Sequence, residues 1–283
     1  MKKTLIALML VAALAVEAQI ETPAASTPTT LTTRIGLTDV KISYSRPRLR
    51  GRKIFGTGKD FLEQYDKIWR TGANQGSVIT FGDDVEIEGT KVPKGEYLIL
   101  TKPGATEWTV YIHKQVSIGG NVGDYKPEND AASFVVKPEK LTEKVEMFTI
   151  NVTDVSDDNT TGKIQLAWEN TSVKFGVKVD FDSKVMKAIE ANTKVNPNSY
   201  ITAARYYMDT KKDLKKALEW VDLGIAQGDP NAFWNYYLKA QIQKAAGDKA
   251  GAKATATKSL EMAKKAENDF GYIAQNETLI KSL

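Results

Sequence analysis

Five positively charged side chains lie within eight residues of this chain, where together they could bind an anion. They are Arg46, Arg48, Arg50, Arg52 and Lys53. A guanidinium group binds a carboxylate or a phosphate through paired hydrogen bonds, whereas a lysine ammonium acts as a point charge. The segment therefore suggests a site for an anionic ligand.

Aromatic and amide side chains on either side of this segment complete the candidate site. Tyr44 precedes the arginines, and Trp69, Arg70 and Asn74 follow them. The rings would stack on a ligand such as a glycan while the arginines clamp it. The ligand-binding candidates are therefore Tyr44, Arg46, Arg52, Trp69, Arg70 and Asn74. An alternative is that Arg46 and Arg70 brace the connection by binding its carbonyl groups and internal carboxylates.

Carboxylates nearby offer a second chemistry, which is acid–base catalysis of hydrolysis. Asp83 and Asp84, together with Arg70, are the candidates for such a hydrolase. Adjacent residues of a strand point to opposite faces, however. The aspartate pair is therefore expected to form a turn, with Glu86 and Glu88 on the solvent face, and no residue is assigned as catalytic.

His113 is the only histidine in the chain. A Ser-His-Asp triad would have to use it, with Ser77 or Ser117 as the nucleophile. The sequence lacks the Gly-x-Ser-x-Gly turn that presents such a serine in one large hydrolase class. His113 is therefore expected at the surface or at a strand end.

Metal and cofactor sites are not expected. Zinc prefers Cys and His ligands, and the chain has no Cys and one His. A group of oxygen-bearing side chains before Gly162 lacks the spacing of a calcium loop and favours a hydrated turn: Asp154, Asp157, Asp158 and Asn159. The glycine clusters at 56–59 and 119–123 match neither a phosphate loop nor a dinucleotide fingerprint.

The elements that would position these residues are mostly strands. Nine short strands without alternating helices favour an antiparallel sandwich, with Pro47 ending the first of them. They are expected at 37–45, 77–81, 85–88, 96–101, 107–113, 132–137, 146–153, 162–168 and 172–179. Residues 89–95 are expected to form a hairpin turn. The apolar spacing of residues 60–69 predicts a short helix.

Ordered motifs in this part of the chain resemble the DUF2911 family of exported Bacteroidetes proteins, for which no function is established. They include Tyr-Ser-Arg-Pro at 44–47, Gly-Arg-Lys-Ile-Phe-Gly at 51–56 and Trp-Arg-Thr-Gly-Ala-Asn at 69–74. Further motifs lie at 87–89, 92–97 and 103–110. Gln75-Gly76 and His113 depart from the family pattern. The resemblance covers about residues 36–180 and implies no activity.

Residues 1–18 have the pattern of a signal peptide, with two lysines, an apolar run and a small-residue cleavage motif that ends at Ala18. The apolar run is too short to span a bilayer. Cleavage after Ala18 would leave a periplasmic or secreted chain with 37 basic and 34 acidic residues, a balance too small to indicate nucleic-acid binding. Residues 19–34 are rich in Thr, Ala, Ser and Pro and are expected to form a flexible leader.

The period of the pattern changes after Phe181. Residues 182–195 are expected to form a linker helix, and residues 196–283 form a helical domain in which Asp213-Leu-Lys-Lys-Ala is followed 35 residues later by Asp248-Lys-Ala-Gly-Ala. This period resembles the tetratricopeptide repeat. The helix pairs are expected at 199–208 with 214–227 and at 232–246 with 249–266, followed by a last helix at 272–282.

The sequence thus predicts an α+β multidomain protein, with an antiparallel β-sandwich over residues 35–181 followed by a helical hairpin-repeat domain. The preferred function is that of an exported, non-enzymatic binding or scaffolding protein of the cell envelope. Its ligand surface would lie at the arginine-rich connection, and a protein partner would contact the helical repeats. The alternative is the hydrolase. No nucleic acid, membrane span or cofactor is expected.

Overall fold

The computed structural model describes residues 22–192 and 196–283. Contacts divide the chain after Phe181 into two compact units, and each is described by itself. The predicted signal peptide over residues 1–18 lies outside the described residues. Within the described ranges, none of the helices combines the length and the apolar character needed to cross a membrane.

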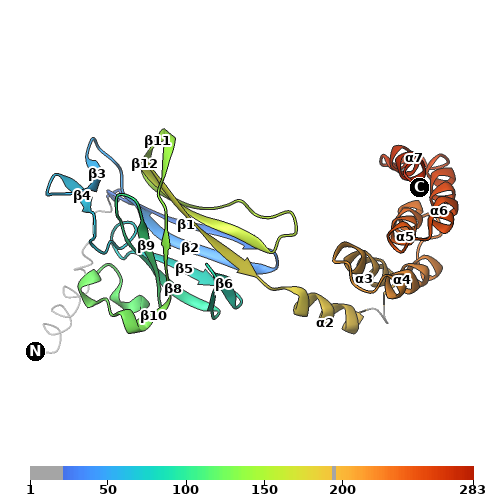
Figure 1. The fold of residues 1–283 in the computed structure, drawn as a ribbon, viewed down its shortest axis with the longest axis horizontal. Helices are drawn as coiled ribbons and strands as arrows, with labels where there is room; N and C mark the ends of the chain where they lie inside the picture. The colour runs from blue at the N-terminus through green and yellow to red at the C-terminus, as the bar shows by residue number, and fades with distance from the viewer. Residues whose placement is uncertain (1–21, 193–195) are drawn as a thin grey trace, which may run out of the picture. The chain divides into compact units, whose positions relative to one another are not determined.

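The first unit is built on a six-stranded antiparallel sheet (Figure 1). Its spatial order is β1-β2-β5-β8-β9-β10, so that the strands before and after the basic connection, β2 and β5, are direct neighbours. The strands are β1 (Thr27–Ile35), β2 (Thr38–Arg46), β5 (Ser77–Phe81), β8 (Gly95–Lys102), β9 (Trp108–His113) and β10 (Asp130–Val136). Three short 3₁₀ helices join β9 to β10: η1 (Val116–Ile118), η2 (Val122–Asp124) and η3 (Pro127–Asn129).

A four-stranded antiparallel sheet in the order β11-β12-β6-β7 forms the second layer. It consists of β11 (Glu139–Thr153), β12 (Thr161–Val179), β6 (Val85–Ile87) and β7 (Thr90–Val92). Buried side chains of both sheets form one continuous core, which confirms the predicted sandwich. A small parallel pair, β3 (Lys53–Gly56) with β4 (Phe61–Gln64), lies in the segment between β2 and β5.

Alternating burial along β2 shows why this sequence forms a half-buried strand. Val40, Ile42 and Tyr44 are buried, whereas the residues between them are exposed or half-buried. At the end of β2 the core becomes aromatic. The ring of Phe55 packs edge-on against Trp69, Trp108 and Trp168. Aromatic pairs in this geometry add to the stabilisation that burial itself provides.

Three predictions about the first unit are wrong. The second half of the expected leader, residues 27–34, belongs to the strand β1, which pairs with β2 along its whole length, because Thr is β-branched and favours extended backbone. The expected helix at 60–69 is instead the strand β4, which pairs with β3. The two strands expected at 162–168 and 172–179 are one strand, β12, in which Glu169 adopts a positive φ of 55°.

The predicted hairpin turn at 89–95 is shorter than expected, since residues 90–92 form β7. The near-helical spacing of 60–69 was misleading because residues 61–64 pair with β3 instead of forming helical hydrogen bonds. The ring of Phe61 occupies the space that a Cβ at Gly56 would need, and the Tyr65 N–H donates to the Gly56 carbonyl over 2.9 Å.

The second unit is all helical and follows the predicted pattern closely. Its helices are α2 (Asp182–Asn192), α3 (Pro197–Asp209), α4 (Leu214–Gln227), α5 (Phe233–Ala245), α6 (Lys249–Ala263) and α7 (Tyr272–Lys281). Side chains of Asn196, Asp213 and Asp248 accept hydrogen bonds from the first turns of α3, α4 and α6, as N-caps do. Buried alanines allow close packing within the two hairpins α3–α4 and α5–α6.

The linker helix begins and ends as predicted within the described residues, but it packs as part of the second unit. Tyr206 of α3 donates a hydrogen bond to Asp182 of α2, and the Lys212 ammonium pairs with the same carboxylate at 3.0 Å. The helix α2 accordingly belongs to the helical unit, which begins at Asp182.

Candidate functional site

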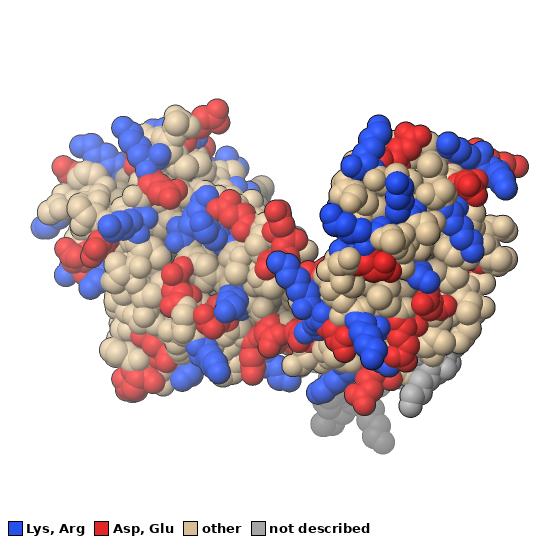
Figure 2. Space-filling view, turned by 45° about the vertical axis from the view of Figure 1, so that its right-hand side comes forward, with Lys and Arg blue, Asp and Glu red and all other residues tan. Residues whose placement is uncertain are grey.

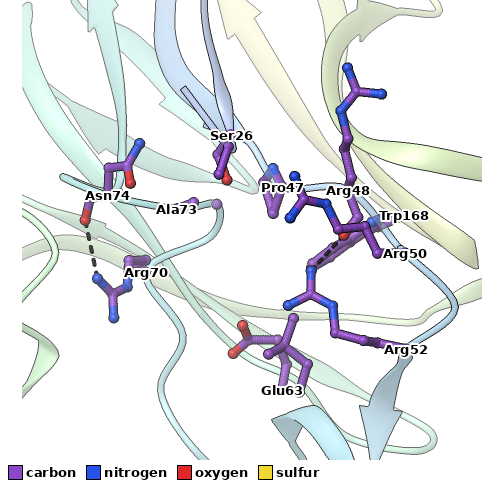
Figure 3. Close-up of a pocket in the computed structure, with 13 residues that line it drawn as sticks. Ser26, Pro47, Arg48, Arg50, Arg52, Glu63, Arg70, Ala73, Asn74 and Trp168 are labelled. Atoms are coloured by element: carbon purple, nitrogen blue, oxygen red, sulfur yellow. Dashed lines mark hydrogen bonds between the residues drawn. The ribbon is translucent and has the colours of Figure 1, made fainter. Parts of the chain in front are cut away.

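A pocket of about 330 Å³ opens over the basic connection of the first unit (Figure 3). One wall is the segment 47–52 that follows β2, and the opposite wall is the loop 70–74. Glu63 of β4, Trp168 of β12 and Ser26 ahead of β1 complete the lining. We call this the arginine pocket, because four arginine residues line it: Arg48, Arg50, Arg52 and Arg70.

Arg52 and Arg70 reach the pocket from opposite walls and are each oriented by main-chain carbonyls. Arg52 donates from Nη2 to the Arg48 carbonyl at 2.5 Å and from Nε to the Leu49 carbonyl at 3.2 Å. Arg70 donates from Nη1 to the Asn74 carbonyl at 3.1 Å. The other N–H groups of both guanidinium groups have no partner within residues 22–192 and 196–283, so they are available to a ligand.

Asn74 lies at the pocket mouth and links its loop to β2. Its Nδ2 donates to the Ser45 Oγ over 3.1 Å, and the residue lines the pocket. Three of the six predicted ligand-binding residues are therefore brought together in one pocket: Arg52, Arg70 and Asn74.

The other three predicted residues have structural contacts instead. Tyr44 is buried, and its hydroxyl both donates to the Ile150 carbonyl and accepts from the Ile150 N–H. Arg46 donates from Nε to the Phe148 carbonyl at 3.0 Å and from Nη2 to the Thr149 Oγ1 at 2.6 Å. These contacts tie β2 of one sheet to β11 of the other.

Trp69 lies beneath the pocket rather than in its lining. Its side chain is buried, its Nε1 donates to the Gly72 carbonyl at 3.2 Å, and its ring stacks on Trp168 with 5.8 Å between centroids. The bracing alternative therefore describes Arg46, whereas Arg70 both braces its own loop and faces the pocket.

Glu63 is a pocket residue that the sequence analysis missed. It is the only carboxylate in the lining and lies between the Arg52 and Arg70 side chains in Figure 3. Burial raises the pKa of the Glu63 carboxyl to about 7, although the positive charges of Arg70 and Arg52 oppose the shift. Glu63 stands in the segment that was predicted to be helical, and only the β3–β4 pairing turns it toward the arginines.

Trp168 is a second missed residue. Its side chain is 1% exposed, and its Nε1 has no hydrogen-bond partner among the described residues. A buried donor without a partner is uncommon, because desolvating it costs about 1–3 kcal/mol. Trp168 lines the arginine pocket, but its Nε1 is covered by the protein.

The loop that carries Arg70 holds an unusual backbone. Thr71 has a φ of 54° and Asn74 a φ of 59°, and a β-branched residue such as Thr seldom adopts a left-handed conformation. The neighbours hold it there. Thr71 is fully buried, its Oγ1 lies 3.0 Å from the Thr101 Oγ1, and its carbonyl accepts from Ser77. Strain of this kind clusters at functional sites.

The glycines at 119 and 120 support this loop from below. A Cβ at Gly120 would collide with the Asn74 carbonyl and with the Arg70 guanidinium, and the Gly119 carbonyl lies against Gly76. The glycine cluster that lacked a phosphate-loop pattern therefore has a packing role, which is to let the β9–β10 connection approach the Arg70 loop.

Of the two positions expected for His113, the strand end is observed and the surface is not. His113 is fully buried, and its Nδ1 lies 2.8 Å from the Asp130 Oδ1, while the Tyr125 hydroxyl donates to Asp130 Oδ2 over 2.7 Å. Burial, followed by this hydrogen bond, raises the pKa of Tyr125. His113 ends β9 as expected, but β10 and η2 cover it.

The carboxylates of the hydrolase alternative do not meet Arg70. Asp84 lines a different pocket, near Val85 and Lys178, and its Oδ1 accepts from the Lys94 N–H at 2.8 Å. Asp83 accepts from Thr38. The residues proposed for acid–base catalysis are thus not assembled in the arginine pocket.

The aspartates at 154–158 form a hydrogen-bonded turn. Asp158 accepts from Ser156 and Thr160, and these bonds lower the pKa of Asp158 to about 2. Asp154 pairs with Lys174 at 3.0 Å. Across the described ranges, no group of three or more His, Asp or Glu side chains has the geometry to hold a metal ion.

Charge is mixed over the rest of the visible surface. Figure 2 shows blue and red side chains interspersed over the face in view of each unit. Against this background, the arginine pocket stands out because four basic side chains accompany one acidic side chain there.

Fold and site together define a two-layer β-sandwich protein with a cationic pocket at one end of the sandwich, followed by a helical unit. The family model described as "Protein of unknown function (DUF2911)" matches residues 26–177, so the chain belongs to the DUF2911 family. The match spans the sandwich from just before β1 to near the end of β12. None of the curated proteins matches the chain.

Proposed function

We propose that this chain is a non-enzymatic binding protein that holds a small anionic ligand, or the acidic group of a glycan, in the arginine pocket. The observation that carries the proposal is the pair Arg52 and Arg70, which face one pocket from opposite walls and keep N–H groups free of protein partners. Guanidinium groups oriented in advance bind carboxylates and phosphates with little further loss of side-chain entropy.

The backbone of the same pocket also supports binding. The strained conformations of Thr71 and Asn74 fix the loop that presents Arg70, as is typical of ligand-binding segments. An anion would neutralise the concentrated positive charge and accept from the guanidinium N–H groups of Arg52 and Arg70.

The cellular setting is part of the proposal. The signal-peptide pattern of residues 1–18 favours an exported chain that works in the periplasm or outside the cell. The family resemblance suggests a Bacteroidetes-type cell envelope. Acidic glycans and sugar phosphates of such an envelope are suitable ligand chemistries.

The helical unit is proposed to contact a protein partner through a tetratricopeptide-like hairpin array. A groove of about 540 Å³ between α2 and the α3–α4 hairpin supports this role. Tyr200, Tyr207 and Trp220 line the groove, with Lys216 and Glu219 also in its lining. Aromatic side chains with a polar rim are typical of surfaces that bind peptides or proteins.

Calorimetric titration with D-glucuronate and with sulfate tests the binding proposal. We expect Arg52→Gln and Arg70→Gln each to weaken binding by about tenfold, which corresponds to one charge-assisted contact. Arg34→Gln is the matched control, because Arg34 is exposed and pairs only with Asp39 in the described structure. The control should bind as the wild type does.

Equal affinities in the wild type, the two pocket variants and the Arg34→Gln control would refute the pocket as the binding site. Wild type and a Glu63→Gln variant, incubated with acidic oligosaccharides and phosphate esters, test the hydrolase alternative. Turnover that disappears in Glu63→Gln would favour a hydrolase, since Glu63 is the only carboxylate in the pocket lining.

A further inference from the structure

The position of Glu63 poses a question about how the arginine pocket accommodates an anion. A carboxylate normally pairs with neighbouring guanidinium groups at 4 Å or less. Although Glu63 shares the pocket with Arg52 and Arg70, it forms no such ion pair and no side-chain hydrogen bond within the described structure. An ionised Glu63 would therefore compete with an incoming anion for the same positive charges.

The groups around Glu63 can be listed element by element. The segment 47–52 contributes Arg48, Arg50 and Arg52, and the loop after Trp69 contributes Arg70. Strand β3 places Phe55 opposite Glu63, and the Lys53 ammonium of the same strand lies over the Phe61 ring at 5.7 Å. Trp168 of β12 and Ser26 contribute no charge. Glu63 is thus the only acidic group that faces the pocket.

Burial and charge act on Glu63 in opposite directions, and burial prevails. The partly buried site disfavours the ionised carboxyl, so the pKa of Glu63 is raised to about 7. An anion bound beside Glu63 adds repulsion and neutralises the guanidinium charges that had favoured ionisation. Both effects favour the protonated carboxyl further, and a protonated Glu63 can also donate a hydrogen bond to the ligand.

We propose that the arginine pocket takes up one proton together with its anionic ligand, and that the Glu63 carboxylate receives this proton from solvent. The inference rests on the proposed binding function. It makes Glu63 a residue that regulates affinity, so that the ligand is held at slightly acidic pH and released as the pH rises. No covalent bond forms or breaks apart from the new O–H bond on Glu63.

Calorimetry across pH tests the proposal with sulfate and D-glucuronate, whose charges stay constant between about pH 6 and pH 9. In wild type we expect affinity to fall by up to about tenfold for each pH unit above about pH 7, because one proton is linked to binding. Glu63→Gln carries a neutral isostere of the protonated acid. It should bind as tightly as wild type at low pH and keep that affinity at high pH.

Proton uptake can be counted directly by repeating the titration in two buffers that differ in their heat of ionisation. Near pH 7.5 wild type should take up a fraction of a proton per ligand, at most about one, and Glu63→Gln should take up none. Glu86→Gln is the matched control, since Glu86 lies on β6 and lines a different pocket. It should show the pH course and proton uptake of the wild type.

The outcomes separate the two proposals. Binding with the same pH course in wild type and Glu63→Gln would overturn proton coupling and leave the pocket itself intact. Absence of binding at every pH would overturn the binding function, and the coupling with it. Binding that tightens as the pH rises would also contradict the inference, because it would require release of a proton.

Discussion

Replacing Arg46 should destabilise the sandwich without emptying the pocket. In Arg46→Met the apolar stem is retained, while the hydrogen bonds to the Phe148 carbonyl at 3.0 Å and to the Thr149 Oγ1 at 2.6 Å are lost. A hydrogen bond from a charged donor contributes about 1.5–3 kcal/mol. Arg46 is half-buried, so hydrogen bonds to water replace part of this contribution in the variant. We expect the free energy of unfolding to fall by about 2 kcal/mol.

Native-state hydrogen exchange is the suitable assay, because it follows the sandwich separately from the helical unit. The Phe148 N–H donates to the Pro47 carbonyl at 3.0 Å and reports on the β2–β11 connection. The matched control is Arg48→Met, since the exposed Arg48 side chain forms no hydrogen bond or ion pair within the described residues. Surface substitutions of this kind change stability by at most about 0.5 kcal/mol.

Two results would refute the reasoning about Arg46. The first is a stability for Arg46→Met within about 0.5 kcal/mol of that of Arg48→Met, a difference typical of surface substitutions. The second is a loss of glucuronate affinity in Arg46→Met at temperatures where the variant is fully folded. A loss of affinity would show that Arg46 contacts the ligand and does not serve only to connect β2 to β11.

Three further predictions concern other parts of the chain. Gly120→Ala should displace the Arg70 loop and cost about 1–3 kcal/mol in the free energy of unfolding; wild-type exchange rates in that loop would contradict this. The folded-state pKa of Glu63 lies above its usual value. The free energy of unfolding of wild type should therefore fall by at most about 3 kcal/mol as the pH rises from about 4.5 to 7. In urea titrations, Glu63→Gln should lack this dependence on pH. Ser259→Ala deprives the buried Asn276 amide of an acceptor at 3.0 Å and should destabilise the helical unit by about 1–3 kcal/mol; slower exchange of α6 and α7 amides in the variant would contradict it.

Local patterns in the sequence were sufficient for elements whose stability is local. The helix α4 forms at the predicted residues, because Asp213 caps its first turn and apolar positions recur at helical spacing. The strand β5 likewise forms at the predicted residues 77–81. Elements whose local pattern resembles another structure were missed. The composition of β1 is that of a leader and the apolar spacing of β4 is near-helical, and their pairing with β2 and β3 makes both of them strands.

The candidate site was partly predictable for the same reason. The arginine-rich segment pointed to the correct region, and Arg52, Arg70 and Asn74 do line one pocket there. Charge and residue type could not separate Arg46 from Arg52, because the difference lies in the contact of Arg46 with β11, about one hundred residues away. Glu63 was missed because the segment was predicted as a helix. Position in the sequence gave little signal, because Glu63 is one of three acidic residues between Arg52 and Arg70, together with Asp60 and Asp66.

The most direct test of the central claim is an NMR titration of the arginine Nε–H signals with D-glucuronate in the full-length protein. The account predicts that the signals of Arg52 and Arg70 shift together and saturate at one concentration, while the Arg46 signal, held by Phe148, stays in place. A titration that moves Arg46, or that leaves Arg52 and Arg70 unchanged, would contradict it.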